Sequence, residues 1–160
     1  MPEYYIVEFI LKCRNYFTIW YTDDRDGFVT SGDKIYRSGT LEELKKYAED
    51  NEIPLHDDEI ARFDIDRLLS SNISEMSCDE IMNYWNIFSD MAGSAGVRFC
   101  GDDKSYNVLY NEIFSGCGAA VTVFGSKTEG LRKDYLEETK FVLEQGCEIL
   151  HNALERPFRE

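Results

Sequence analysis

Residues 4–13, YYIVEFILKC, and residues 16–22, YFTIWYT, decide the fold because they concentrate aromatic and β-branched side chains near the start of the chain. In the first stretch every odd position from 5 to 13 is apolar, whereas Glu8 and Lys12 fall on the opposite side. This period of two predicts a strand with one dry face and one partly wet face.

Turn residues follow these two stretches. Arg14-Asn15 is short enough for a tight turn between the two strands, which predicts a hairpin. Asp24-Arg25-Asp26-Gly27 and Gly32-Asp33 indicate two more turns, between short strands at 28–30 and 34–37. Together these elements predict an antiparallel meander.

Capping boxes predict where the first two helices begin. Thr40-Leu41-Glu42-Glu43 is a capping box that begins a short helix, which Asn51 and Pro54 end. Residues 63–66, FDID, alternate in polarity and indicate another half-buried strand. Ser77-Cys78-Asp79-Glu80 is a second capping box, followed by apolar residues at helical spacing as far as residue 92, with Gly93 and Gly96 as predicted stops.

Two more helices are expected near the end of the chain. One covers residues 103–115 and ends at Gly116, with these side chains directed inward: Tyr106, Leu109, Tyr110, Ile113 and Phe114. The other covers residues 131–154 and is ended by Pro157. Strands therefore precede helices, which is the α+β pattern: an N-terminal antiparallel β meander packed with a helix-rich C-terminal half. The length of 160 residues predicts a single domain spanning 1–160.

The middle of the chain is much more acidic than the rest. Residues 50–103 contain thirteen acidic residues and three arginines, and so carry ten of the fourteen net negative charges. Clustered like charge repels itself, but it also steers encounter with a positively charged partner. The same acidity argues against nucleic acid and anionic membranes as ligands, because phosphate binding needs clustered lysine and arginine. A solubilising surface is the other explanation for this charge.

The cysteine content and the N-terminus predict a cytoplasmic location. The five cysteines are an odd number without a CxxC pair, which is typical of reduced thiols: Cys13, Cys78, Cys100, Cys117 and Cys147. The first residues lack the basic region of a signal peptide, and no apolar run approaches the ~20 residues that span a membrane.

No motif for catalysis, cofactor binding or metal binding is evident in the sequence. The two histidines, His56 and His151, have no ligand at zinc spacing, although Cys100 or Cys117 could meet His151 in space. Gly116-Cys117-Gly118 lacks the lysine of a phosphate loop. Runs of adjacent acids serve acid–base chemistry only in a desolvated pocket and are typical of solvated loops. We expect no catalytic residues, no cofactor and no metal.

Two stretches resemble immunity proteins of bacterial contact-dependent growth inhibition and related polymorphic toxin systems. Residues 84–90, YWNIFSD, and 109–116, LYNEIFSG, are similar to the Trp-Asn-x-Phe-x-Asp and Leu-Tyr-Asp-Lys-Leu-Phe-x-Gly-Asn-Asn patterns of those proteins, over roughly residues 81–118. Here Asn111-Glu112 replaces Asp-Lys, and Cys117-Gly118 replaces Asn-Asn. Only Asn86 and Asp90 are polar and off the buried stripe, so we expect local hydrogen bonds or an exposed face for them.

The resemblance implies a cytosolic protein that binds one cognate toxin domain tightly and without turnover. Many such toxins are nucleases, whose clefts are basic because they hold phosphates. The C-terminal domain of a basic toxin is therefore the expected partner, and the sequence leaves the oligomeric state open. The expected binding face contains Asp57, Asp58, Glu59, Asp64, Asp66, Asp102 and Asp103. A second candidate group lies at the hairpin tip: Asp23, Asp24 and Asp26.

An exposed tyrosine or tryptophan beside these acids is expected to anchor the complex, because interface hot spots are enriched in aromatic residues. Two other interpretations stay open. One is an acidic nucleic-acid mimic that inhibits a DNA-binding enzyme, which would need acids at regular intervals along one surface. The other is a small enzyme that uses carboxylates.

Overall fold

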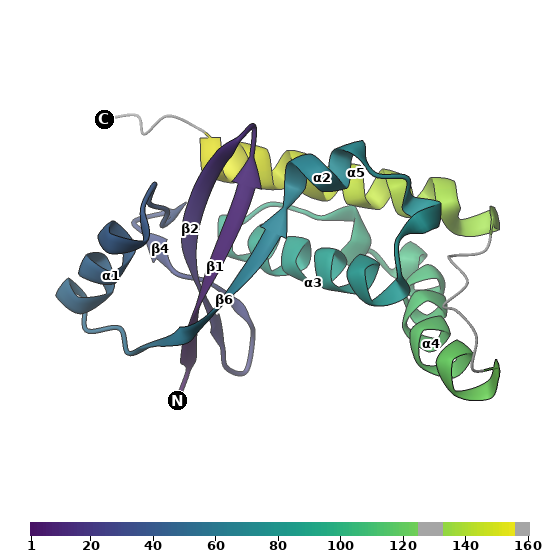
Figure 1. Ribbon diagram of the computed structural model, residues 1–160, viewed down its shortest axis with the longest axis horizontal. Helices are drawn as coiled ribbons and strands as arrows, with labels where there is room; N and C mark the ends of the chain where they lie inside the picture. Colours follow the sequence, from purple (N-terminus) through teal and green to yellow (C-terminus); the bar gives the residue numbers. More distant parts are fainter. Residues whose placement is uncertain (125–132, 156–160) are drawn as a thin grey trace.

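The computed structural model describes residues 1–124 and 133–155, and its centre is a four-stranded sheet (Figure 1). The strand order is β3-β2-β1-β6, formed by Gly27–Phe28, Arg14–Thr22, Glu3–Leu11 and Leu55–Asp64. The first three strands are antiparallel neighbours, as predicted. The two-residue strands β4 (Thr30–Ser31) and β5 (Lys34–Ile35) form a separate ladder. β6 pairs in parallel with β1, a pairing for which no prediction was made from the sequence.

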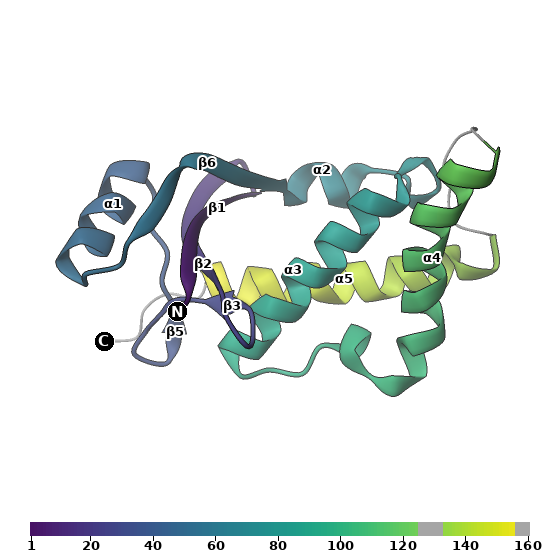
Figure 2. The same ribbon diagram turned by 90° about the horizontal axis from the view of Figure 1, so that it is seen from below.

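Helices cover both faces of the sheet. Figures 1 and 2 show α1 (Leu41–Asp50) on one side, α3 (Cys78–Ala95) and α5 (Lys133–Glu155) on the other, and α4 (Asn107–Phe124) at the far end of α3. The short α2 (Ile65–Ser70) and three 3-10 turns, Ile73–Glu75, Cys100–Asp102 and Lys104–Tyr106, connect them. The predicted α+β class is confirmed. No helix among the described residues has the length and apolar character to cross a bilayer.

The face of β1 predicted to be partly wet is partly buried at Tyr4 and Ile10, but its middle is drier than predicted. Ile6 packs under α1 against Leu44 and Ala48, and is fully buried. Glu8 on the same face is only 3% exposed. Its carboxylate accepts hydrogen bonds from Asn15 Nδ2 at 3.1 Å and from Arg62 Nε, which supplies the partners that a buried charge requires.

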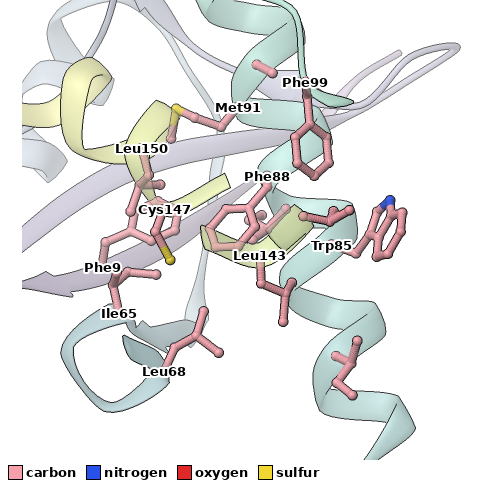
Figure 3. Close-up of a cluster of buried hydrophobic side chains, with 14 of the residues drawn as sticks. Phe9, Ile65, Leu68, Trp85, Phe88, Met91, Phe99, Leu143, Cys147 and Leu150 are labelled. Atoms are coloured by element: carbon pink, nitrogen blue, oxygen red, sulfur yellow. The ribbon is translucent and has the colours of Figure 1, made fainter. Parts of the chain in front are cut away.

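The main core lies between the sheet and helices α3 and α5. Its large buried side chains include Phe9, Trp85, Phe88 and Phe99 (Figure 3). The two helices approach closely at Gly146, where a Cβ atom would lie 2.2 Å from the Phe88 ring. Only glycine fits at this crossing, because interiors are close-packed and tolerate little added volume.

The predicted starts of α1 and α3 are confirmed, but other helix boundaries are not where the sequence predicts them. The hydroxyls of Thr40 and Ser77 each accept the N3 amide at 3.2 Å, as capping boxes require. Gly96, with φ of +71°, ends α3, whereas Gly93 lies within it. α4 begins at residue 107, continues past Gly116 and leaves Phe114 65% exposed, so the predicted stop and the inward position of Phe114 are wrong. Residues 131–132 and Pro157 lie outside the described residues.

Two boundaries near β1 and β6 also differ from the prediction. The first hairpin turns at Lys12-Cys13, with φ of +51° and +61°, and not at Arg14-Asn15, which already belongs to β2. Two consecutive left-handed residues form the type of two-residue turn that matches strand twist. Ile65 begins α2 and does not extend the strand, because Asp64 caps that helix.

Candidate functional site

Asp64 and Asp66 hold the backbone where β6 passes into α2. Asp64 Oδ1 accepts the amide of Arg67 at 3.0 Å and caps the helix. The two carboxylate oxygens of Asp66 accept the amides of Lys12 at 2.7 Å and Cys13 at 2.8 Å. Asp66 therefore ties the strained hairpin turn to α2. Both acids have a structural role, and their participation in partner binding stays a prediction.

Asp57, Asp58 and Glu59 form a bulge in the edge strand β6. The register with β1 shifts here, so that Tyr5 pairs with His56 while the next residue, Ile6, pairs with Ile60. All three acids are exposed, and Asp57 Oδ2 lies 3.8 Å from Lys45 Nζ. A bulge with charged side chains disfavours further strand pairing at an edge, which gives this segment a role of its own.

The hairpin tip that carries Asp23, Asp24 and Asp26 is exposed and lies against α3 (Figure 2). The Ser94 hydroxyl oxygen accepts the amide of Phe28 at 2.7 Å. A Cβ atom on the neighbouring Gly27 would lie 2.8 Å from both Ser94 Oγ and Tyr21 Oη. The absence of a side chain at Gly27 thus allows the tip to approach the helix and places Asp26 beside it.

Asp90 is close enough to the hairpin tip and to the acids that follow α3 for their charges to act on it. The indole nitrogen of Trp20 donates a hydrogen bond to Asp90 Oδ2 at 2.9 Å. Burial raises the pKa of Asp90, the Trp20 bond opposes this change, and the nearby charges of Asp26 and Asp102 raise it further. Asp102 in turn accepts a hydrogen bond from Ser89 at 2.6 Å. Asp26, from a distant part of the sequence, therefore shares one electrostatic environment with Asp90 and Asp102.

These residues surround a depression of about 440 Å³, which we name the Trp20 hollow. Its walls come from β2, the β2–β3 loop, the end of β6 and one side of α3, and its lining residues are Trp20, Asp26, Phe63, Asn83, Asn86, Ile87, Ser89 and Asp90. The half-exposed Trp20 lies beside two acids, Asp26 and Asp90. The sequence predicted an exposed tyrosine or tryptophan beside acids but did not indicate which one. Asp90 was not among the predicted binding residues, because its partner lies 70 residues away in the chain.

An aromatic row continues from the Trp20 hollow across the sheet. The rings of Trp20 and Tyr5 have centroids 5.8 Å apart, and Tyr5 stacks on His56 at 4.8 Å. The pKa of Tyr5 is raised by burial, then by its hydrogen bond to Glu3 and by the charges of Glu3 and Asp58. The β6 bulge is therefore within electrostatic reach of this row. Asp103, by contrast, is paired with Arg98 at 2.9 Å.

No family model matches the chain, and neither does a curated protein or a solved structure. The residues of the sequence resemblance can still be placed. Asn86 accepts a hydrogen bond from Tyr110 at 3.0 Å, and Asp90 accepts one from Trp20, so both residues are hydrogen-bonded, but to partners 24 and 70 positions away and not to local ones as expected. Trp85, Phe88 and Leu109 are buried as expected.

The thiols and histidines form no activated nucleophile among the described residues. Burial raises the pKa of the Cys147 thiol to about 12, with a smaller contribution from Glu144. Such a thiol stays protonated and unreactive. His151 Nδ1 lies 2.8 Å from Glu155 Oε2, and the Cys117 side chain lies outside the described residues. Within residues 1–124 and 133–155, no three His, Cys, Asp or Glu side chains are grouped to hold a metal ion.

Proposed function

We propose that this protein is a cytoplasmic immunity protein that binds and neutralises the basic C-terminal domain of a cognate toxin. One observation carries the proposal: Asp90 accepts the indole N–H of a half-exposed tryptophan at the rim of a hollow, and the charges of Asp26 and Asp102 act on the same carboxylate. An aromatic anchor surrounded by acids has the chemistry to bind a basic protein surface.

The unfavourable environment of the ionised Asp90 carboxylate supports a binding role. Asp90 is held where burial and two neighbouring carboxylates oppose its ionisation. A stabilising core contact would not need these charges, whereas a partner with positive charges would relieve their repulsion and associate faster. A nuclease domain offers such charges in its phosphate-binding cleft. Occupying that cleft would exclude the nucleic acid.

The proposal is tested by capturing the partner from a lysate of the organism that encodes the chain, with washes at rising salt. The bait is the full chain in three forms: wild type, the triple variant Asp23→Asn/Asp24→Asn/Asp26→Asn, and a matched control. The control, Asp33→Asn/Glu112→Gln/Glu137→Gln, removes the same number of charges from exposed positions elsewhere. We expect the wild type and the control to retain one basic toxin domain, and the triple variant to release it at much lower salt.

The activity of the captured domain then tests the proposed function. Purified with the chain removed, it should degrade nucleic acid, and adding one equivalent of the wild-type chain should stop the reaction. Residual activity at a large excess of the chain would contradict the immunity function. Capture of a DNA-binding enzyme that is no toxin would instead favour nucleic-acid mimicry.

A further inference from the structure

The Trp20 hollow is lined by groups that accept hydrogen bonds and by apolar surface, without a compensating cation. None of the described residues that line it is a lysine, arginine or histidine. Asp26 and Asp90 contribute carboxylates, Asn83 and Asn86 contribute amides, and Trp20 contributes an indole ring. Its volume of about 440 Å³ is in the range of sites that take small ligands or single side chains.

Asp90 is fixed in place and has unused hydrogen-bonding capacity. Its Oδ2 atom accepts the Trp20 indole N–H at 2.9 Å, which orients the carboxylate and the ring together. Its Oδ1 atom has no hydrogen-bond donor among the described residues. A half-buried carboxylate oxygen without a donor favours a ligand that donates hydrogen bonds and carries positive charge.

Among cationic groups, a guanidinium fits these walls best. It is planar, it is less strongly hydrated than an ammonium group, it can donate to two carboxylates at once, and it stacks on aromatic rings. An ammonium group would be a hydrated point charge and would use the indole and the apolar residues Phe63 and Ile87 less well. A phosphate or carboxylate ligand would be repelled by Asp26 and Asp90.

We propose that the Trp20 hollow is the docking site for an arginine side chain of the protein partner, with the guanidinium between Trp20 and the carboxylates of Asp26 and Asp90. The identity of that partner rests on the proposed function, but the recognition of arginine belongs to this chain and can be measured without the partner. The arginine would act as the central hot spot of the interface, since arginine and tryptophan are the residue types enriched there.

The test is an NMR titration of the full ¹⁵N-labelled chain with N-acetyl-arginine methylamide, observed at the two indole N–H signals. Trp20 reports on the hollow, whereas Trp85 is 1% exposed and serves as an internal reference. We expect a saturable shift of the Trp20 signal in the millimolar range and no shift of the Trp85 signal. The lysine analogue should bind more weakly, and the neutral citrulline analogue should produce no saturable shift.

Two variants make the test specific to the hollow. Asp26→Asn should weaken arginine binding by about fivefold through loss of one charge-assisted contact. The matched variant Asp33→Asn, in the exposed β4–β5 turn, should leave binding unchanged. The proposal is overturned if no saturable shift occurs up to ~100 mM probe, if citrulline binds as well as arginine, or if both variants weaken binding equally. If the chain captures a toxin domain but does not bind the arginine probe, the docking site is refuted and the proposed function is not. If it binds the arginine probe but captures no toxin, the proposed function is refuted and the docking site is not.

Discussion

The acids of the α2 junction and Asp90 of the Trp20 hollow come from the same acidic stretch, yet they have different surroundings. At the junction, Asp64 and Asp66 accept three backbone amides between them. In the hollow, Asp90 accepts one indole N–H, and two further carboxylates raise its pKa in addition to burial. The first pair satisfies donors of its own fold, whereas the second group has negative charge that the fold does not neutralise.

This difference shows that the donors around a carboxylate, and not its place in an acidic run, determine what it does. A carboxylate that accepts backbone amides stabilises the native state, because its removal leaves those amides unpaired. A carboxylate that faces other carboxylates opposes folding slightly and is useful only when a cation arrives. Substitutions should therefore separate the two regions by their effects on stability and on binding.

The largest expected effect on stability comes from Asp66. In Asp66→Ala both amides of the Lys12-Cys13 turn lose their acceptor, and we expect the free energy of unfolding to fall by about 2 kcal/mol. Asp66→Asn keeps one acceptor oxygen and should lose less. Urea unfolding of the three proteins measures both values. A loss for Asp66→Ala no larger than for an ordinary surface substitution would remove the distinction between the two regions.

The helix cap at Asp64 should have a smaller effect. Asp64→Ala removes the acceptor for the Arg67 amide and should cost about 1 kcal/mol of unfolding free energy. Asp64→Ser supplies another capping oxygen and should recover most of that loss. If serine and alanine destabilise the protein equally in urea unfolding, the contribution of Asp64 is not that of a cap.

For the hollow, the effect on stability should have the opposite sign to that at the junction, and it should disappear at low pH. Because folding raises the pKa of Asp90, the folded state binds the proton more tightly than the unfolded state, and ionised Asp90 lowers stability at pH 7. That penalty disappears as the pH falls below the range of an ordinary aspartate. Asp90→Asn, whose amide oxygen can still accept the Trp20 N–H, should raise the unfolding free energy at pH 7 by less than ~1 kcal/mol.

At about pH 3 the same variant should show no gain, because the wild-type carboxyl is then protonated. Urea unfolding at both pH values provides the comparison. An equal difference between wild type and Asp90→Asn at the two pH values would mean that the charge of Asp90 is not the cause.

The sequence was sufficient for the features that depend on neighbouring residues. The period of two before residue 11 and the capping boxes at Thr40 and Ser77 predicted β1, α1 and α3, because each signal lies within one element. The parallel pairing of β6 was missed, since a strand does not show from its own residues which partner it will have. Gly116 did not end α4, because a glycine only permits a helix to end and does not require it.

The candidate site could be predicted only in part, for the same reason. The hairpin tip named Asp26 and the acidic stretch named Asp102 as candidates, but the approach of Asp26 to Asp90 depends on the contact between the hairpin tip and α3 at Gly27. The hydrogen bond from Trp20 to Asp90 joins residues 70 positions apart, so no local pattern reports it. Asp66, likewise, is bonded to a turn more than 50 residues earlier in the chain.

The smallest expected effect on stability, at Asp26, gives the sharpest contrast between the regions. Asp26 is exposed and accepts no hydrogen bond among those of the described residues, so Asp26→Asn should change the unfolding free energy by no more than ~0.5 kcal/mol. Association with the captured toxin domain should nevertheless slow severalfold at low salt, because one steering charge is lost. Asp57→Asn is the matched control, equal in charge but on the β6 bulge. If both variants slow association equally, the whole acidic field steers the partner; if only Asp26→Asn does, the Trp20 hollow is where contact is made.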